Sequence, residues 1–149
     1  MKVVCVGNRW RCDDGAGLHV ARRLRALGVE ALEQEGEPAG LIDAFEGADS
    51  LVVVDAVSSG SAPGTVHRLE AGEQPLPSEL FGASTHLLGL AEAIELARAL
   101  GRLPAQVVVY GIEGAVFDAG DRLSPAVAEA VERVAEAVRE EVKGCTSGR

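Results

Sequence analysis

The feature that most constrains the fold is an apolar run near the start of the chain, Val3 to Val6, followed by a polar loop and the adjacent aspartates Asp13 and Asp14. Apolar residues without polar alternation are typical of a strand covered on both faces, as in a parallel sheet between helices. The functional edge of such a sheet is the carboxyl end of its strands. We therefore expect the loop and both aspartates at that edge.

Further runs repeat this pattern along the chain. Leu51 to Asp55 is an apolar run that ends on a carboxylate, and Gln106 to Tyr110 forms a third buried strand. Helical periodicity predicts helices from about Asp13 to Leu27, from Leu41 to Phe45, from Ser84 to Leu100, and from Pro125 onward. A weak strand is predicted over Val29 to Leu32, a loop over 33–40, and an edge strand, of the kind that is often antiparallel, over Thr65 to Leu69. Together these elements predict a three-layer α/β/α sandwich around a mostly parallel, twisted sheet of about five strands.

Length and charge limit the classes of protein that this chain can belong to. A chain of 149 residues with 47% apolar content fits a single domain, predicted over 1–143, with a flexible tail over 144–149. A net charge of -9 argues against a broad nucleic-acid surface. No apolar run approaches the roughly 20 residues of a membrane span, and the segment before the first strand is too short for a signal peptide. The sequence therefore predicts a cytoplasmic protein.

The three cysteines, Cys5, Cys12 and Cys145, include no C-x-x-C pair. This spacing favours neither a disulfide framework nor a four-ligand zinc site. Cys5 lies in the first strand and is expected to pack in the core. Only Cys12 is placed to react, and a thiol-protease triad of Cys12 with His86 and an aspartate remains an alternative.

A nucleotide or flavin site is disfavoured. Dinucleotide binding needs G-x-G-x-x-G after the first strand, and no Walker sequence occurs in the chain. Asp13 and Asp14 would repel a phosphate at the position where one would bind. Gly15 and Gly17, which follow the aspartates, are better explained by close packing of a helix on a strand.

Carboxylates at this edge suit a cation instead. In a parallel sheet, Asp14, Asp55 and His86 would converge on the carboxyl edge from different crossovers. Two carboxylates and one imidazole make an O/O/N ligand set with open positions, which fits nickel or zinc. From the residues alone a structural alternative stays open, in which Asp14 is a helix cap, Asp55 a loop anchor and His86 a first-turn residue. Asp13 is expected to cap the helix rather than bind metal.

Three motifs resemble the signatures of a known family. They are Gly7-Asn8-x4-Asp13-Asp14-Gly15-x-Gly17, Val53-Val54-Asp55-Ala56-Val57, and Ser84-Thr85-His86-x-x-Gly89-Leu90. In this order and at these separations they resemble the hydrogenase maturation endopeptidases, which remove a C-terminal extension from the large subunit of nickel-iron hydrogenases. The resemblance extends from Val3 to the last helix, and Tyr110-Gly111-Ile112-Glu113 resembles a further strand end of that family.

The resemblance implies a function and a set of site residues. It assigns Asp14, Asp55 and His86 to the recognition of nickel already present in the substrate, with a polarised water or carbonyl completing the reaction. The partner would be the nickel-iron hydrogenase large-subunit precursor. Gly36 and Gly40, in a loop that matches the family less closely, are predicted substrate contacts. From the residues themselves, Trp10, between Arg9 and Arg11 at a loop tip, is either an exposed contact to the substrate or a cover over the end of the sheet. A non-catalytic chaperone that binds nickel or the large subunit through the same site is the alternative.

Overall fold

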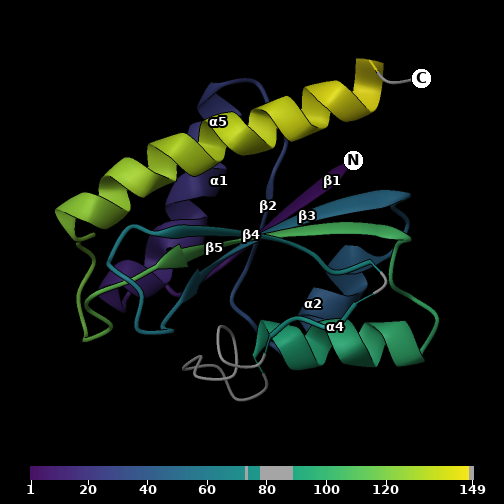
Figure 1. Cartoon of the computed structure of the whole chain (residues 1–149), viewed down its shortest axis with the longest axis horizontal. Helices are drawn as coiled ribbons and strands as arrows, with labels where there is room; N and C mark the ends of the chain where they lie inside the picture. Colours follow the sequence, from purple (N-terminus) through teal and green to yellow (C-terminus); the bar gives the residue numbers. More distant parts are fainter. Residues whose placement is uncertain (73, 78–88, 148–149) are drawn as a thin grey trace.

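The computed structural model describes residues 1–72, 74–77 and 89–147 of the chain (Figure 1). The strands are β1 (Lys2–Val6), β2 (Leu32–Gln34), β3 (Ser50–Val57), β4 (Val66–Glu70) and β5 (Gln106–Glu113). The helices are the 3-10 turn η1 (Cys12–Gly15), α1 (Ala16–Ala26), α2 (Pro38–Phe45), α4 (Leu90–Ala99) and α5 (Pro125–Ser147).

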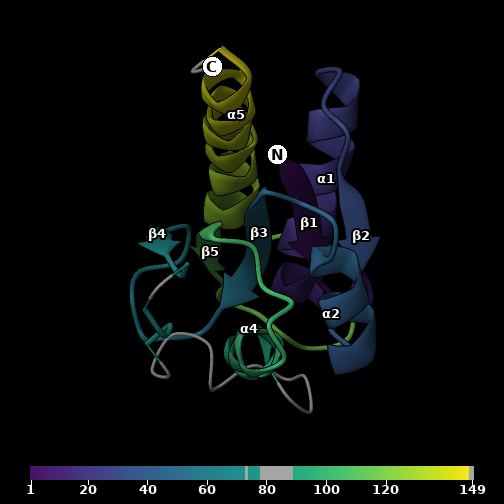
Figure 2. The ribbon, with the colours of Figure 1, turned by 90° about the vertical axis from the view of Figure 1, so that its right-hand side faces the viewer.

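The five strands form one sheet in the order β2-β1-β3-β5-β4. All neighbouring pairs are parallel except β4 with β5, which are antiparallel. Helices α1 and α5 cover one face of the sheet, and α2 and α4 cover the other (Figures 1 and 2). The predicted three-layer sandwich and the antiparallel edge strand are therefore confirmed.

The strands are continuous apolar runs because their alternate side chains enter two different cores. In β3, Val52 and Val54 belong to the core beneath α1 and α5. Leu51 and Val53 belong to the core beneath α2 and α4. All eight residues of β3 are buried. A strand of this kind has no solvent-exposed face, and its sequence therefore does not alternate between apolar and polar residues.

The second strand and the loop after it differ from the prediction. The strand begins at Leu32, because its position is set by pairing with β1 rather than by its own apolar residues: Val4 is opposite Leu32, and Val6 is opposite Gln34. Leu32 itself is 44% exposed. The predicted loop over 33–40 was too long, since α2 already begins at Pro38, a residue well suited to the first helical position.

Two helix ends also differ from the prediction. The chain enters α1 through the separate 3-10 turn η1 instead of one helix from Asp13. At the other end of the chain, α5 continues past Gly144, where the sequence predicts a tail, and ends at Ser147. The predicted start of the third long helix, at Ser84, lies outside the described residues; its described part is α4.

Candidate active site at the carboxyl edge of the sheet

Two of the predicted site residues, Asp14 and Asp55, lie at one edge of the sheet, where β1 and β3 end. A Cβ added to Gly17 would lie 2.2 Å from the carbonyl oxygen of Val6 and 3.0 Å from that of Val54. The start of α1 therefore rests directly on the ends of both strands, as the glycine pattern predicted. Asp55 follows Val54, and η1, which carries Asp14, lies against β3. The strand order reverses between β1 and β3, and such a switch point is the usual ligand site of an open α/β sheet.

The loop between β1 and η1 folds back onto Asp14. The backbone N–H of Asn8 donates to the Asp14 carbonyl at 3.0 Å, and the N–H of Asp14 donates to the carbonyl of Arg11 at 3.0 Å. A Cβ at Gly7 would lie 2.5 Å from the Asp14 carbonyl oxygen, so this close approach requires glycine. Asp14 is 3% exposed and Asp55 1% exposed. Asp55 Oδ1 accepts a hydrogen bond from the N–H of Ala56 at 2.8 Å.

The neighbouring Asp13 does not cap a helix, contrary to the prediction. Its carboxylate makes no capping hydrogen bond to η1 or α1. It accepts instead from the N–H groups of Ala115 (2.8 Å), Val116 (2.9 Å) and Ser124 (2.7 Å), and from the Ser124 hydroxyl (2.8 Å). Burial raises the pKa of Asp13, but the hydrogen bonds from Ser124, Val116 and Ala115 outweigh it and hold the pKa below its usual value. Asp13 therefore fastens the connection between β5 and α5 to the site.

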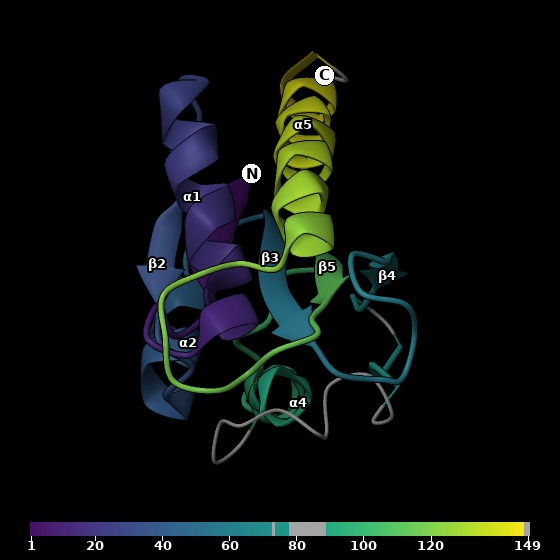
Figure 3. The ribbon, with the colours of Figure 1, turned by 90° about the vertical axis from the view of Figure 1, so that its left-hand side faces the viewer.

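This connection runs past η1 before it turns into α5 (Figure 3). A second set of contacts holds it there: the N–H of Cys12 donates to the carbonyl of Gly120 at 2.8 Å, and the N–H of Gly120 donates to the carbonyl of Trp10 at 2.9 Å. A Cβ at Gly120 would lie 2.9 Å from the Cys12 sulfur. The Cys12 thiol is thus packed against this connection. Cys5 lies in the core as expected, and burial raises the pKa of its thiol to about 12.

Buried charge is concentrated at this edge. The buried charged residues of the described part of the chain are four acids, Asp13, Asp14, Asp55 and Glu113. Glu113 ends β5 next to Val57 of β3. A buried carboxylate is unfavourable unless hydrogen bonds or a cation compensate its charge. Hydrogen bonds do so for Asp13.

Sequence reasoning did not single out Glu113 as a site residue. Its carboxylate accepts hydrogen bonds from the N–H of Ser59 at 2.7 Å and from the Ser59 hydroxyl at 2.5 Å. The Nε2 atom of His67 lies 3.2 Å from Glu113 Oε1. The available signal was the acid itself, because Glu113, like Asp55, closes an apolar strand at its carboxyl end.

The structure places the other predicted site residues in different surroundings. His86 lies outside the described residues, and within the described ones no group of three His, Cys, Asp or Glu side chains could hold a metal ion. Trp10 is 67% exposed, so the alternative that it covers the end of the sheet is wrong. Gly36 has a φ of +93°, which favours glycine, in the turn that follows β2 at the same edge. Gly40 lies inside α2, where a Cβ would be 3.0 Å from Oε1 of Gln34.

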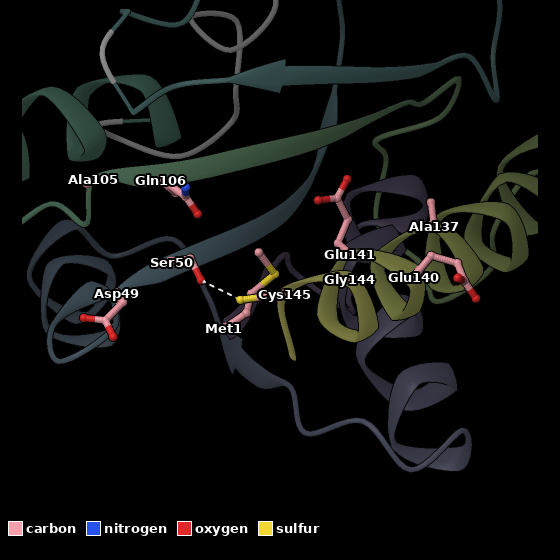
Figure 4. Close-up of a pocket in the computed structure, with 10 residues that line it drawn as sticks. All are labelled: Met1, Asp49, Ser50, Ala105, Gln106, Ala137, Glu140, Glu141, Gly144 and Cys145. Carbon is pink, nitrogen blue, oxygen red and sulfur yellow. Dashed lines mark hydrogen bonds between the residues drawn. The ribbon is translucent and has the colours of Figure 1, made fainter. Parts of the chain in front are cut away.

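A hollow of about 860 Å³ lies at the opposite edge of the sheet, where the strands begin. Ser50, at the start of β3, and Cys145, near the end of α5, meet there, with 3.5 Å between Oγ and Sγ (Figure 4). Carboxylates of Asp49, Glu140 and Glu141 also line it. It is separate from the buried acids at the carboxyl edge.

Comparison with known proteins decides the family. The family model described as hydrogenase maturation protease matches residues 23–141. The chain belongs to this family. The matched range includes Asp55 and His86, and Asp14 precedes the start of that range. As a member of this family, the protein is an endopeptidase. Among its described residues, no helix is long and apolar enough to cross a membrane.

Relatives match most of the chain. The hydrogenase expression/formation protein HupD of Thiocapsa roseopersicina is 30% identical over 148 residues, which cover 90% of this chain and 67% of the relative. The hydrogenase 2 maturation protease of Escherichia coli is 32% identical over 152 residues, 91% of this chain and 86% of the relative. The solved structure of the [NiFe] hydrogenase maturation protease HybD from Thermococcus kodakarensis matches with a TM-score of 0.76 and 29% identity, over 94% of this chain and 98% of that one.

Proposed function

We propose that this maturation protease removes the C-terminal extension of a nickel-loaded large-subunit precursor of a nickel-iron hydrogenase. The observation that carries the proposal is the burial of Asp14 and Asp55 together at the β1/β3 switch point. Neither acid is part of the two hydrophobic cores. Two buried carboxylates in a chain of this family are suited to meeting a cation that the substrate brings.

The chemistry follows from ligand type. The precursor holds its nickel through soft thiolates, and Asp14, Asp55 and His86 add harder oxygen and nitrogen ligands at the open positions of the metal. The metal thus belongs to the substrate. Its positive charge attracts the buried carboxylates on binding, and a precursor without nickel lacks this attraction. This difference makes the metal the main determinant of recognition.

A water molecule is the proposed nucleophile. The Cys12 thiol is packed against Gly120, so the thiol-protease triad is the less favoured mechanism. The hydroxyl of Ser59 donates to Glu113, and no hydrogen bond joins it to an imidazole of the described residues. Polarisation of the scissile carbonyl or of water close to the metal supplies the rest of the reaction.

The contacts to the rest of the substrate are proposed at the rim of this edge. Trp10 is exposed on the loop after β1, where an aromatic ring can anchor a partner surface. Gly36 and Gly40, in and after the turn that follows β2, are the other proposed contacts. The cytoplasmic location expected from the sequence stays a prediction.

Charge-removing substitutions test this function. Asp14→Asn and Asp55→Asn keep the shape of each side chain and remove its charge, and each is expected to lower cleavage of the nickel-loaded precursor at least about a hundredfold. The released C-terminal fragment is measured by mass spectrometry, and folding is checked by thermal unfolding. Asp43→Asn, at an exposed aspartate on α2, is the matched control and is expected to cleave normally.

The outcomes separate the two functions drawn from the family resemblance. Cleavage by the unsubstituted protein that is lost in both site variants supports the proposal. Tight binding of the precursor without cleavage by the unsubstituted protein would instead support the chaperone. Normal cleavage by both Asn variants would show that the buried acids have no part in the reaction.

A further inference from the structure

A row of paired residues crosses the sheet at the level of Asp55. Asp55 pairs with Gly111 of β5, and Gly111 pairs with His67 of β4. Paired residues in neighbouring strands place their side chains on the same face. That face is the one beneath α2 and α4, because Val53 and Leu69, two residues away in each strand, pack into its core. Asp55 and His67 therefore face the same layer of the molecule.

The residue between them has no side chain. Because Gly111 is the residue paired with both, β5 has no side chain at that position of the row, between Asp55 and His67. Two strand spacings put their backbones about 10 Å apart. Asp55 and His67 thus stand on either side of Gly111 on the same face of the sheet.

Glu113 fixes the orientation of the His67 ring. Its side chain is 2% exposed, and the N–H and hydroxyl of Ser59 both donate to it. A carboxylate accepts hydrogen bonds, so the proton of the neutral imidazole lies on Nε2, which faces Glu113 at 3.2 Å. The Nδ1 atom then carries a lone pair. Within the described residues no hydrogen bond to Nδ1 is present, and the His67 side chain remains 19% exposed.

The described part of the site offers few other bases. Asp13 already accepts four hydrogen bonds from residues of the connection to α5. Asp14 and Asp55 are assigned to the nickel in the proposed function. His19 lies on α1, on the other face of the sheet. Because Ser59 donates to Glu113 rather than to His67, the three residues orient a base and do not form a serine-nucleophile triad.

We infer that His67 is a catalytic residue of this protease and acts as its general base, an inference that rests on the proposed function. Nδ1 of His67 takes a proton from water as the water oxygen bonds to the scissile carbonyl carbon. The proton then passes to the amide nitrogen as the C–N bond breaks. The products are a new carboxyl terminus on the subunit and a free amine on the released tail. Glu113, held by Ser59, is a positioning residue that stabilises the protonated ring.

Substitution of His67 with two readouts tests this role. Cleavage of the nickel-loaded precursor by His67→Gln is expected to show a kcat at least about a hundredfold lower, with KM within about threefold of the unsubstituted value, because a base acts in the transition state and not in binding. His67→Ala is assayed with and without added imidazole, which is expected to restore part of the lost rate. His19→Gln is the matched control and is expected to keep the normal kcat.

Circular dichroism and thermal unfolding establish that each variant is folded. A normal kcat for folded His67→Gln would overturn the role of His67 and leave the proposed function standing. A loss in His67→Ala that imidazole does not restore, or a loss carried mainly by KM, would show a structural or binding role and overturn the inference. Absence of cleavage by the unsubstituted protein would refute the proposed function, and the role of His67 with it.

Discussion

The four hydrogen bonds that Asp13 accepts allow the effect of removing its charge to be worked out bond by bond. Oδ2 accepts from the N–H groups of Ala115 and Val116 and from the Ser124 hydroxyl, and Oδ1 accepts from the Ser124 N–H. In Asp13→Asn the amide can keep its oxygen at the Oδ2 position. Its NH₂ group then faces the Ser124 N–H, donor against donor, and the three remaining hydrogen bonds lose their charge assistance.

The cost of this change follows from the energies of single hydrogen bonds. A hydrogen bond to a charged group contributes about 1.5 to 3 kcal/mol, and a donor left without an acceptor costs about 1 to 3 kcal/mol. Since the variant loses one bond and weakens three, we expect a loss of about 2 to 4 kcal/mol in the free energy of unfolding at pH 7. Urea unfolding followed by circular dichroism measures it. Asp118→Asn, at an exposed aspartate of the same connection, is expected to change stability by less than about 0.5 kcal/mol.

The pH dependence gives an independent check. The pKa of Asp13 is lower in the folded protein than its ordinary value of 3.8. Its contribution to stability is therefore complete above the unfolded-state pKa and is lost as the pH falls through the folded-state pKa. The stability difference between the unsubstituted protein and Asp13→Asn should accordingly be constant near neutral pH and shrink below about pH 4. Equal stability of the two proteins at pH 7, or a gap that widens in acid, would refute this reasoning.

Three further substitutions probe the edge of the sheet, and a fourth, Gly144→Ala, is a control far from it. Gly17→Ala places a Cβ about 2.2 Å from the Val6 carbonyl oxygen, and urea unfolding should show a free energy of unfolding lower by more than about 3 kcal/mol. In the same assay Gly144→Ala should be neutral or stabilising, because nothing lies within 4 Å of its added Cβ. Trp10→Ala should raise KM for the precursor several-fold and leave the melting temperature unchanged, because the ring is 67% exposed. Cys12→Ser should retain most of the cleavage rate in the mass-spectrometric assay.

Each of these has a distinct contrary result. Equal stability of the Gly17 and Gly144 variants would mean that the start of α1 does not rest on the strand ends as described. An unchanged KM for the Trp10 variant would remove that ring from the substrate contacts. A folded Cys12→Ser protein that binds the precursor without cleaving it would favour the thiol mechanism.

The sandwich and half of the candidate site could be predicted from the sequence because both depend on local patterns. Apolar runs without alternation indicate strands buried on both faces, and an acid that closes such a run must lie at the carboxyl edge. This reasoning placed Asp14 and Asp55 correctly. It placed β2 too early, because that strand is positioned by pairing with β1 and not by its own composition.

The roles of Asp13 and Glu113 could not be predicted in the same way, because their partners are far away along the chain. Asp13 binds Ala115, 102 positions later, and Glu113 binds His67, 46 positions earlier. No local pattern encodes such contacts. A capping role was the natural prediction for Asp13 because acids are common at helix starts, but the fold uses its carboxylate to hold a distant connection.

Recognition of the substrate through its nickel is the central claim, and cleavage of matched precursors tests it most directly. The purified protein is mixed with large-subunit precursor prepared with and without nickel, and the C-terminal fragment is followed by mass spectrometry. Asp14 and Asp55 are buried, and in the proposed function they meet the positive charge of the metal on binding. The account predicts cleavage of the nickel-loaded precursor only, and equal cleavage of both forms would contradict it.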